Sequence, residues 1–133
     1  MQPTNHLDQI HIRNLEVMGI LGIKPEEQEN PQLIRVNATL WVDTRVAARS
    51  DDIADAVNYR TITKAMIAHI ERGRPCLVER LVQELADLCL ATQANVAAVE
   101  VTVEKPTALR HAESVGITIR RARVDSEQDA AEG

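Results

Sequence analysis

The chain has 133 residues, enough for one domain to bury a hydrophobic core without the support of disulfides or metal ions. The net charge is −5 at pH 7, but four acidic residues after Arg123 supply most of it, so composition excludes a general nucleic-acid binder. No apolar run approaches the roughly 20 residues of a membrane-spanning helix, which argues against an integral membrane protein.

Two β-strands are predicted in the first part of the chain. In residues 7–18, Ile10 and Ile12 alternate with polar neighbours, although the alternation becomes less regular from Leu15 onward. Residues 33–46 alternate over a longer stretch, with one apolar and one mostly polar face, so the predicted sheet is buried on one side only. The segment between the strands, GIKPEEQENP, is acidic and contains two prolines, which is typical of a loop.

Two helices are predicted in the middle of the chain. Residues 51–58 form a connection, and Asn58 is a plausible cap for a helix over residues 59–72 that ends before Gly73. A second helix is predicted over residues 76–92. Its apolar residues follow the i, i+3, i+4, i+7 spacing of a helix packed on a core.

Two further strands complete the predicted domain. Valines alternate with polar residues over 99–104, and residues 115–119 repeat the pattern after a loop over 105–113. The order strand, strand, helix, helix, strand, strand predicts the α+β class, with a four-stranded antiparallel sheet and two helices on its apolar face. We expect one domain over residues 1–124 and a disordered acidic tail over residues 125–133.

The other face of the predicted sheet suggests an assembly. Asn37, Thr39, Trp41 and Thr118 make that face too mixed for a dry core and too uncharged for a simple solvated surface. The two edge strands of an open sheet also need to be covered. Both features would be explained if subunits joined their sheets edge to edge into a ring.

Glu79 interrupts the apolar pattern of the second predicted helix. It lies in the first turn, where unpaired backbone N–H groups and the helix dipole favour a negative charge. One interpretation is a solvated glutamate that stabilises the helix. The other is a carboxylate that anchors a ligand carrying N–H donors.

Other polar residues could meet at one rim of the domain. Glu26 and Glu27 lie in the first loop, Asn58 and Tyr59 open the first long helix, and Lys105 ends the third strand. Each has an ordinary explanation as a solvated charge or a packing residue. The ends of strands and helices can nevertheless converge, and a converging group of this kind could perform acid–base chemistry.

The basic residues and the histidines point less clearly to a function. Arg60, Lys64, Arg110 and His111 offer enough positive charge for a small anionic group, although they fit a solvated surface as well. The histidines lack the spacing of a metal site, and the chain contains no GxSxG, P-loop or GxGxxG motif. We therefore expect neither a metal ion nor a nucleotide cofactor.

The cysteines and the amino terminus indicate a compartment. Cys76 and Cys89 lie on or near the apolar stripe of one helix, too far apart to form a disulfide, and are predicted to be reduced core residues. The amino terminus, MQPTNHLDQI, lacks the apolar segment of a signal peptide. We expect a soluble cytoplasmic protein.

Four ordered segments resemble a known family. The segments GIKPEE, DDIADAVNYRTITKAMIAHIE, LVERL and VEKPTALRHAESV are similar to those of the dihydroneopterin aldolase and dihydroneopterin triphosphate epimerase family. The resemblance extends over about residues 7–121. It implies the tunnelling fold, in which subunits form a tetrameric barrel, two of which commonly stack into an octamer. It also implies a pterin substrate, active sites between neighbouring subunits, and no metal or cofactor.

The resemblance also implies roles for individual residues. Glu79 corresponds to the family's anchor for the pterin ring, with backbone contacts from Val78 before it. Lys105 corresponds to the catalytic lysine after the third strand, Tyr59 to a catalytic tyrosine, and Glu27 to the loop acid near the reacting side chain.

Two more residues complete the expected site, and they bear on the choice of reaction. Asn58 is expected to contribute to substrate binding, and Arg110 to meet a triphosphate. Many aldolases have a His-Gly pair before the acidic loop and a Pro-Gly-rich loop after the lysine, whereas this chain has Leu21-Gly22 and TALRHAES. These differences favour 2′-epimerisation. Dihydroneopterin aldolase activity and a non-catalytic pterin-binding ring protein remain the alternatives.

Overall fold

A four-stranded antiparallel sheet and two long helices form most of the structure, a computed structural model in which residues 7–123 are described. The predicted disordered tail over residues 125–133 lies outside these residues. The elements are β1 (Asp8–Gly19), α1 (Pro25–Glu29), β2 (Gln32–Val42), α2 (Arg45–Ser50), the 3-10 turn η2 (Ile53–Asp55), α3 (Tyr59–Arg72), α4 (Val78–Thr92), β3 (Ala98–Lys105) and β4 (Val115–Ala122).

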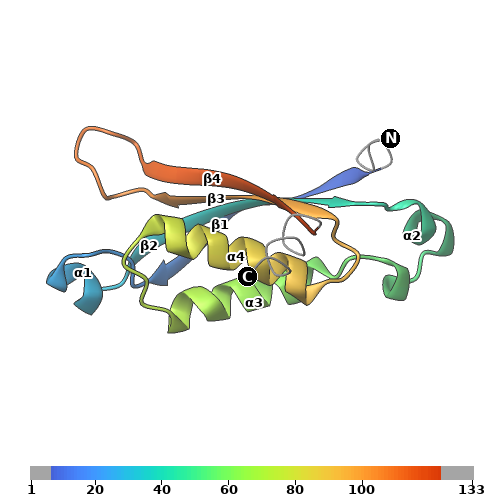
Figure 1. The fold of residues 1–133 in the computed structure, drawn as a ribbon, viewed down its shortest axis with the longest axis horizontal. Coiled ribbons are helices and arrows are strands. Elements are labelled where there is room, and N and C mark those ends of the chain that lie inside the picture. The colour runs from blue at the N-terminus through green and yellow to red at the C-terminus, as the bar shows by residue number, and fades with distance from the viewer. Residues whose placement is uncertain (1–6, 124–133) are drawn as a thin grey trace, which may run out of the picture.

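The strands lie side by side in the order β1-β2-β3-β4, and each pair is antiparallel. Helices α3 and α4 cover one face of the sheet (Figure 1). The predicted α+β fold is therefore confirmed. The irregular end of the first strand has a local cause, because the register shifts between Ile12 and Leu15 at a bulge. There Asn14 adopts a left-handed φ of 54° and its backbone N–H bonds the Asn37 side chain at 2.8 Å.

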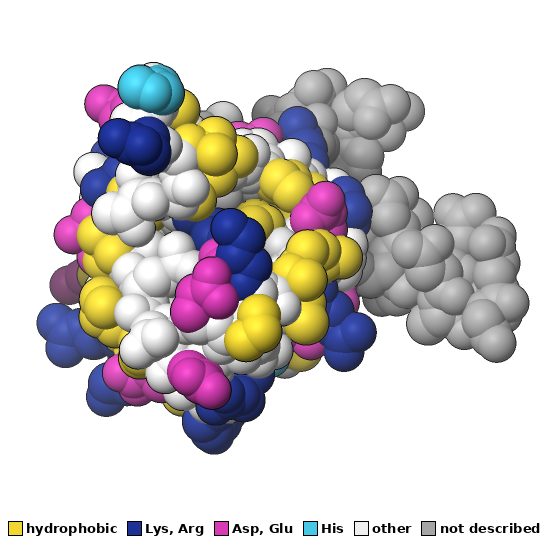
Figure 2. Space-filling model, turned by 90° about the vertical axis from the view of Figure 1, so that its left-hand side faces the viewer, with side chains coloured by type: hydrophobic (Ala, Val, Ile, Leu, Met, Phe, Trp, Pro, Cys, Tyr) yellow, Lys and Arg dark blue, Asp and Glu magenta, His cyan; other side chains and the backbone are white. Residues whose placement is uncertain are grey.

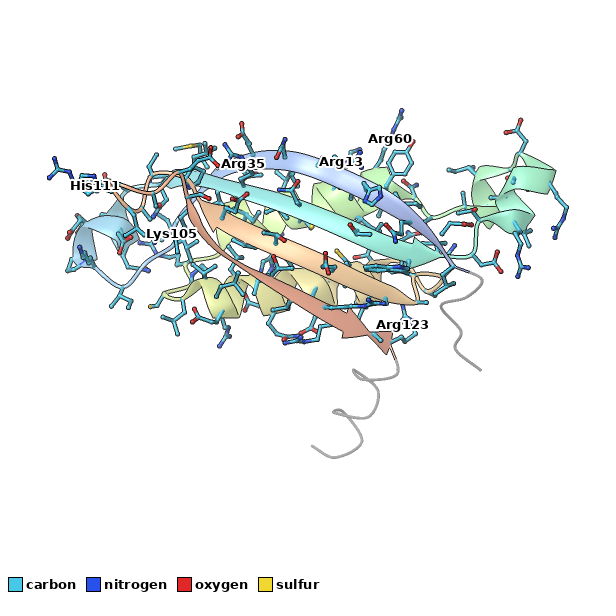
Figure 3. The ribbon with its side chains drawn as sticks, turned by 90° about the horizontal axis from the view of Figure 1, so that it is seen from above. Arg13, Arg35, Arg60, Lys105, His111 and Arg123 are labelled. Atoms are coloured by element: carbon cyan, nitrogen blue, oxygen red, sulfur yellow. The ribbon has the colours of Figure 1, made fainter. Side chains whose placement is uncertain are left out.

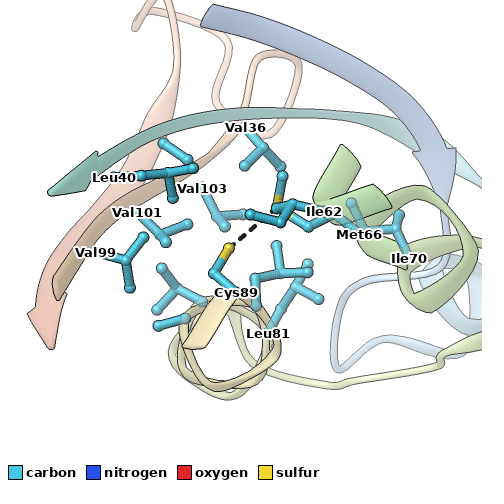
Figure 4. Close-up of a cluster of buried hydrophobic side chains, with 14 of the residues drawn as sticks. Val36, Leu40, Ile62, Met66, Ile70, Leu81, Cys89, Val99, Val101 and Val103 are labelled. Carbon is cyan, nitrogen blue, oxygen red and sulfur yellow. Dashed lines mark hydrogen bonds between the residues drawn. The ribbon is translucent and has the colours of Figure 1, made fainter. Parts of the chain in front are cut away.

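The core lies between the apolar face of the sheet and the two helices. Ile62, Met66 and Ile70 line the inner side of α3, and Leu81 and Leu85 are among the residues that α4 buries. Figure 4 shows Ile62, Met66, Ile70 and Leu81 against the valines of β3. The Cys89 thiol lies 3.8 Å from the Met66 sulfur. The apolar stripes of the two helices face the apolar side of the sheet. One layer between them therefore buries the apolar residues of both the helices and the strands.

Helix α3 agrees with its prediction at both ends. The Asn58 side chain accepts a hydrogen bond from the backbone N–H of Thr61 at 3.1 Å, which confirms it as the cap. Gly73 follows the last residue of the helix. Helix α4 begins at Val78, two residues later than expected, and this leaves Cys76 exposed. The prediction that Cys76 is a core residue was therefore wrong, whereas Cys89 is fully buried.

Three segments predicted as strand or loop contain short helices. Residues 45–50 form α2 instead of continuing the second strand, because the Asp43 carboxylate bonds both the backbone N–H and the guanidinium of Arg45 and turns the chain. The acidic loop contains α1, whose Pro25 suits the first helical turn. The connection over 51–58 contains η2, capped by Asp52.

The polar face of the sheet carries ordered contacts. The Arg120 guanidinium lies 4.3 Å from the centroid of the Trp41 ring, a cation–π arrangement. The hydroxyl groups of Thr102 and Thr118 lie 2.6 Å apart. Strands β1 and β4 are the two edges of the sheet. Closure of these edges against other subunits stays a prediction.

Candidate active site

Lys105 and Glu27 form an ion pair at one end of the molecule. Lys105 is the last residue of β3, and Glu27 lies in α1, which immediately precedes β2. The Lys105 Nζ donates a hydrogen bond to Glu27 Oε2 at 3.1 Å, and the two side chains are only 12% and 27% exposed. A half-buried ammonium and carboxylate in contact provide a group that can hold or pass a proton.

The contacts of Glu27 stabilise its charged form. Its Oε1 accepts a hydrogen bond from the backbone N–H of Lys24 at 3.3 Å. The hydrogen bond from Lys105, followed by that from Lys24, holds the pKa of the Glu27 carboxyl below its usual value. Both carboxylate oxygens are therefore engaged, and the group is fixed in one orientation.

The loop that carries Glu27 is attached to the segment before α4. The Gly22 N–H donates to the Pro75 carbonyl at 3.2 Å, and the Gln28 side chain donates to the Gly22 carbonyl at 2.6 Å. Arg74 donates a further hydrogen bond to the Gln28 carbonyl. These bonds place the Lys105–Glu27 ion pair and the amino-terminal end of α4 at the same end of the fold (Figure 1).

Val78 and Glu79 are the first two residues of α4. Glu79 is exposed, and within residues 7–123 no hydrogen bond or ion pair engages its carboxylate. Val78 is partly buried and packs against the core, which fixes the backbone on which Glu79 stands. The carboxylate is thus free to accept N–H donors from a ligand.

Tyr59 and Asn58 lie at the other end of the subunit. The Asn58 N–H donates to the side chain of Gln93, the residue that follows α4, at 3.0 Å. The 15 residues of α4 span about 22 Å and separate this end from Glu79. The possibility that the polar residues meet at one rim therefore does not hold within a single subunit for Tyr59, which is 53% exposed, or for Asn58. The expectation that the site lies between neighbouring subunits stays a prediction.

Three hollows are relevant to the site. One of about 340 Å³ adjoins the ion pair, and its lining includes Lys24, Glu27, Gln32 and Thr107. One of about 280 Å³ lies at Tyr59 and is lined by Ile53, Val57, Asn58, Tyr59 and Arg60. The largest, about 500 Å³, lies between the end of α3 and the start of α4 around His69 and Arg80, and none of the predicted site residues lines it. We therefore locate the candidate site by its charged side chains and not by the volume of the hollows.

The charged groups at the Lys105 end are mixed in sign. Figure 2 views this end and shows acidic and basic side chains side by side near its centre, flanked by hydrophobic ones. Arg110 lies on the exposed β3–β4 loop beside His111, which Figure 3 shows at the same end as Lys105. Arg60 lies farther along the molecule.

Sequence reasoning missed three residues of this region. Lys24 adds a positive charge beside Glu27, Gln28 bonds the Gly22 carbonyl, and Gly22 approaches the Glu27 carboxylate closely. The only signal in the sequence was a glycine before the Pro-Glu-Glu segment, and it indicated no more than a turn. No group of histidine, cysteine or acidic residues within residues 7–123 is arranged to hold a metal ion.

Known proteins share both the sequence pattern and the fold of this chain. The model of the dihydroneopterin aldolase (FolB) family matches residues 10–120. A dihydroneopterin triphosphate 2′-epimerase of Pseudomonas aeruginosa is 45% identical over 84% of this chain and 89% of its own. A dihydroneopterin aldolase of Escherichia coli is 36% identical over 86% and 93%. The crystal structure of E. coli dihydroneopterin aldolase in complex with neopterin superimposes with a TM-score of 0.83 at 36% identity, covering 86% of this chain and 99% of that one.

Proposed function

Because the chain belongs to the dihydroneopterin aldolase family, we propose that it is an enzyme that epimerises 7,8-dihydroneopterin triphosphate at carbon 2′. The observation that carries the choice of reaction is the 45% identity to an epimerase, against 36% to an aldolase of similar coverage. Dihydroneopterin aldolase activity is the second candidate, favoured by the neighbour that holds neopterin. A non-catalytic pterin-binding protein is disfavoured, because the relatives are enzymes.

The proposed reaction is a retro-aldol cleavage followed by re-addition. A base removes the proton of the 2′-hydroxyl, the bond between carbons 1′ and 2′ breaks, and its electrons pass into the C6=N5 unit of the ring. The aldehyde that forms at carbon 2′ turns its other face, the bond forms again, and the proton returns to the oxygen. If the aldehyde leaves instead, and carbon 1′ takes the proton, the aldolase products result.

Lys105 and Glu27 are the residues that we assign to proton transfer. Their contact at 3.1 Å supports this assignment, because the pair offers a proton acceptor, the Glu27 carboxylate, beside a proton donor, the Lys105 ammonium, and can take up and return the proton of a substrate oxygen directly or through water. The ring itself accepts the electrons, so the reaction requires neither a Schiff base nor a metal ion.

Glu79 is the proposed anchor of the pterin. The 2-amino group and the adjacent N3–H form a two-donor edge, which one carboxylate can accept through both oxygens. The unengaged carboxylate of Glu79 and the backbone of Val78 at a helix amino terminus support this role. The pterin would then lie at the end of the fold that carries Lys105.

A second subunit would complete the site. The Tyr59 end carries exposed apolar surface, with Ile53 70% exposed, and a hollow lined by Asn58 and Arg60. We assign Tyr59 as a catalytic residue and Asn58 as a substrate-binding residue that act on the pterin held by a neighbouring subunit. The unpaired edges β1 and β4 support a homo-oligomeric ring, a tetramer or a stacked octamer.

The triphosphate of the substrate requires positive charge beyond the reacting carbons. Arg110 on the β3–β4 loop is the residue that the resemblance implies, and Lys24 beside Glu27 is a second cation at the same end. Both are exposed, which suits contacts with a group that extends toward solvent.

The location of the protein in the cell is part of the same proposal. None of the helices within residues 7–123 combines the length and the hydropathy that crossing a bilayer demands. Cys76 and Cys89 are both free thiols. These features support a cytoplasmic enzyme of pterin metabolism.

The deciding experiment is a product analysis. The protein is incubated with 7,8-dihydroneopterin and, separately, with its triphosphate, and the products are separated by chromatography. We expect the 2′-epimer of the triphosphate as the main product. Predominant 6-hydroxymethyl-7,8-dihydropterin and glycolaldehyde would instead assign the aldolase reaction, and no product from either substrate would contradict both.

A further inference from the structure

Gly22 lies unusually close to the Glu27 carboxylate. A Cβ atom added at Gly22 would lie 2.2 Å from Glu27 Cδ and 2.4 and 2.5 Å from its two oxygens. We propose that Gly22 is a positioning residue, whose missing side chain allows the Glu27 carboxylate to lie against the backbone and reach Lys105. This inference rests on the proposed function only for its effect on turnover.

The present position of the carboxylate is set by two hydrogen bonds. Oε2 is held by Lys105 at 3.1 Å and Oε1 by the Lys24 N–H at 3.3 Å. A methyl group at position 22 would occupy the space of the carboxylate itself, so one or both hydrogen bonds would break. The pair would separate although neither of its residues had been changed.

Two hydrogen bonds hold the backbone at position 22 and oppose a movement that would relieve the clash. Its N–H is bonded to the Pro75 carbonyl at 3.2 Å and its carbonyl accepts the Gln28 side chain at 2.6 Å. Its φ of +146° is also a conformation that residues with a side chain rarely adopt. The residue is thus fixed on both sides while it faces the acid.

The same bonds connect the proton-transfer pair to the pterin anchor. Pro75 leads into α4, and Glu79 follows four residues later. Gly22 therefore lies where the loop of Glu27 meets the segment that carries the proposed anchor. Because an added Cβ meets the flexible end of the Glu27 side chain and not the backbone bonded to Pro75, the side chain shifts and the anchor carboxylate stays in place.

The variant Gly22→Ala tests this positioning role. We expect kcat to fall by about a hundredfold, the effect of an ångström-scale misplacement of a catalytic group. Affinity for neopterin, measured by fluorescence titration, should change by less than about threefold, because Glu79 is untouched. The pKa of the Glu27 carboxyl, followed by NMR titration, should rise toward its ordinary value when the hydrogen bond from Lys105 is lost.

Gly73→Ala is a matched control. Gly73 lies in the same region, at the end of α3, but has an ordinary φ of −79°. A Cβ added there would lie 3.0 Å from the His69 carbonyl oxygen, and no atom of Glu27 lies within 4 Å of it. An alanine there should change kcat by less than about twofold. It should shift the pKa of Glu27 by no more than about a few tenths of a unit.

A double-mutant cycle with Glu27→Ala decides between positioning and a general structural effect. Without the carboxylate, Gly22→Ala keeps the strain of its positive φ but has nothing to displace, so it should lower kcat of the Glu27→Ala enzyme by clearly less than it lowers kcat of the wild type. An equal loss in both backgrounds would overturn the proposal. If Gly22→Ala alone fails to fold, a folded double variant supports the clash with Glu27, and an unfolded one refutes it.

The outcome is separable from that of the proposed function. If the wild-type protein turns over neither pterin substrate, the proposed function fails. The positioning role is then judged by two measurements. One is the pKa of Glu27 in the wild type and in Gly22→Ala, and the other is the free energy of unfolding of the four proteins of the double-mutant cycle. Equal destabilisation by Gly22→Ala in both backgrounds, with an unchanged Glu27 pKa, would refute the positioning role even if the enzyme is active.

Discussion

Lys105 and Glu27 are in contact at 3.1 Å although 78 positions separate them in the sequence. The antiparallel register of β2 and β3 brings them together, because Arg35 near the start of β2 pairs with Glu104 near the end of β3. Helix α1 directly precedes β2, so the acid at its centre meets the lysine that ends β3. The sheet register is therefore what assembles the proposed proton-transfer pair.

Replacement of Lys105 by methionine should abolish most turnover while pterin binding remains. The change keeps most of the apolar side chain and removes the titratable ammonium group, so kcat is expected to fall by about 10²–10⁴-fold. Affinity for neopterin, measured by fluorescence titration, should stay near the parent value. Turnover that survives this substitution would show that proton transfer does not pass through Lys105.

Glu27 should lower the stability of the protein as the pH falls into the acidic range. Its pKa in the folded state is lowered, so its stabilising contribution is present above the unfolded-state pKa and is lost as pH falls through the folded-state value. We expect Glu27→Gln to be less stable than the wild type at about pH 7, and we expect this difference to be smaller at about pH 3. Urea unfolding at both pH values measures this difference, and a constant difference would contradict the assigned ion pair.

Glu79 should be required for pterin binding and nearly dispensable for folding. Hydrogen bonds to a charged group contribute about 1.5–3 kcal/mol, so Glu79→Ala should weaken neopterin binding by roughly tenfold to a hundredfold. The loss of a first-turn charge should cost at most about 1 kcal/mol of stability. Glu71→Ala, an exposed glutamate on α3, is the control. Unchanged neopterin affinity in Glu79→Ala would remove the anchor from the proposed site.

Mixed assemblies should test whether one site draws on two subunits. Tyr59→Ala and Lys105→Met subunits are each expected to be inactive. When equal amounts are unfolded and refolded together, random assembly should place an intact Tyr59 beside an intact Lys105 in about a quarter of the sites. The assay is turnover after refolding, with each variant refolded alone as the control. Inactive mixtures would indicate that the two residues do not act across a subunit boundary.

The two cysteines should differ in reactivity. Cys76 is exposed, whereas burial raises the pKa of the Cys89 thiol to about 12. A thiol-reactive chromophore should therefore modify one thiol per native chain and a second only after unfolding. The variant Cys76→Ser should show no rapid reaction, and rapid modification of Cys89 in that variant would contradict the packing of α4 against Met66.

The fold was predictable because its local signals agree with its tertiary packing. The apolar period of α3, its Asn58 cap and the glycine after it predicted both ends of the helix correctly. The second strand was predicted too long because Val46 continues its alternation. A side-chain contact between Asp43 and Arg45 ends the strand instead, and periodicity carries no information about such a contact.

The site was less predictable than the fold. Single residues such as Glu27 and Lys105 suggested chemistry, but their contact depends on strand register across the whole sheet. Tyr59 fits the family pattern yet lies at the far end of the subunit, which no spacing within one chain reveals. Gly22 was missed because its importance comes from the absence of atoms beside a carboxylate.

The location of Trp41 decides what intrinsic fluorescence will report. It is the only tryptophan of the chain, and it lies under the Arg120 guanidinium on the sheet face opposite the helices. Its emission is therefore a probe of that face and of any subunit or solute that approaches it. Loosening of the aliphatic interior will go unseen by this chromophore as long as the stacked guanidinium stays in place, so melting is better followed by circular dichroism.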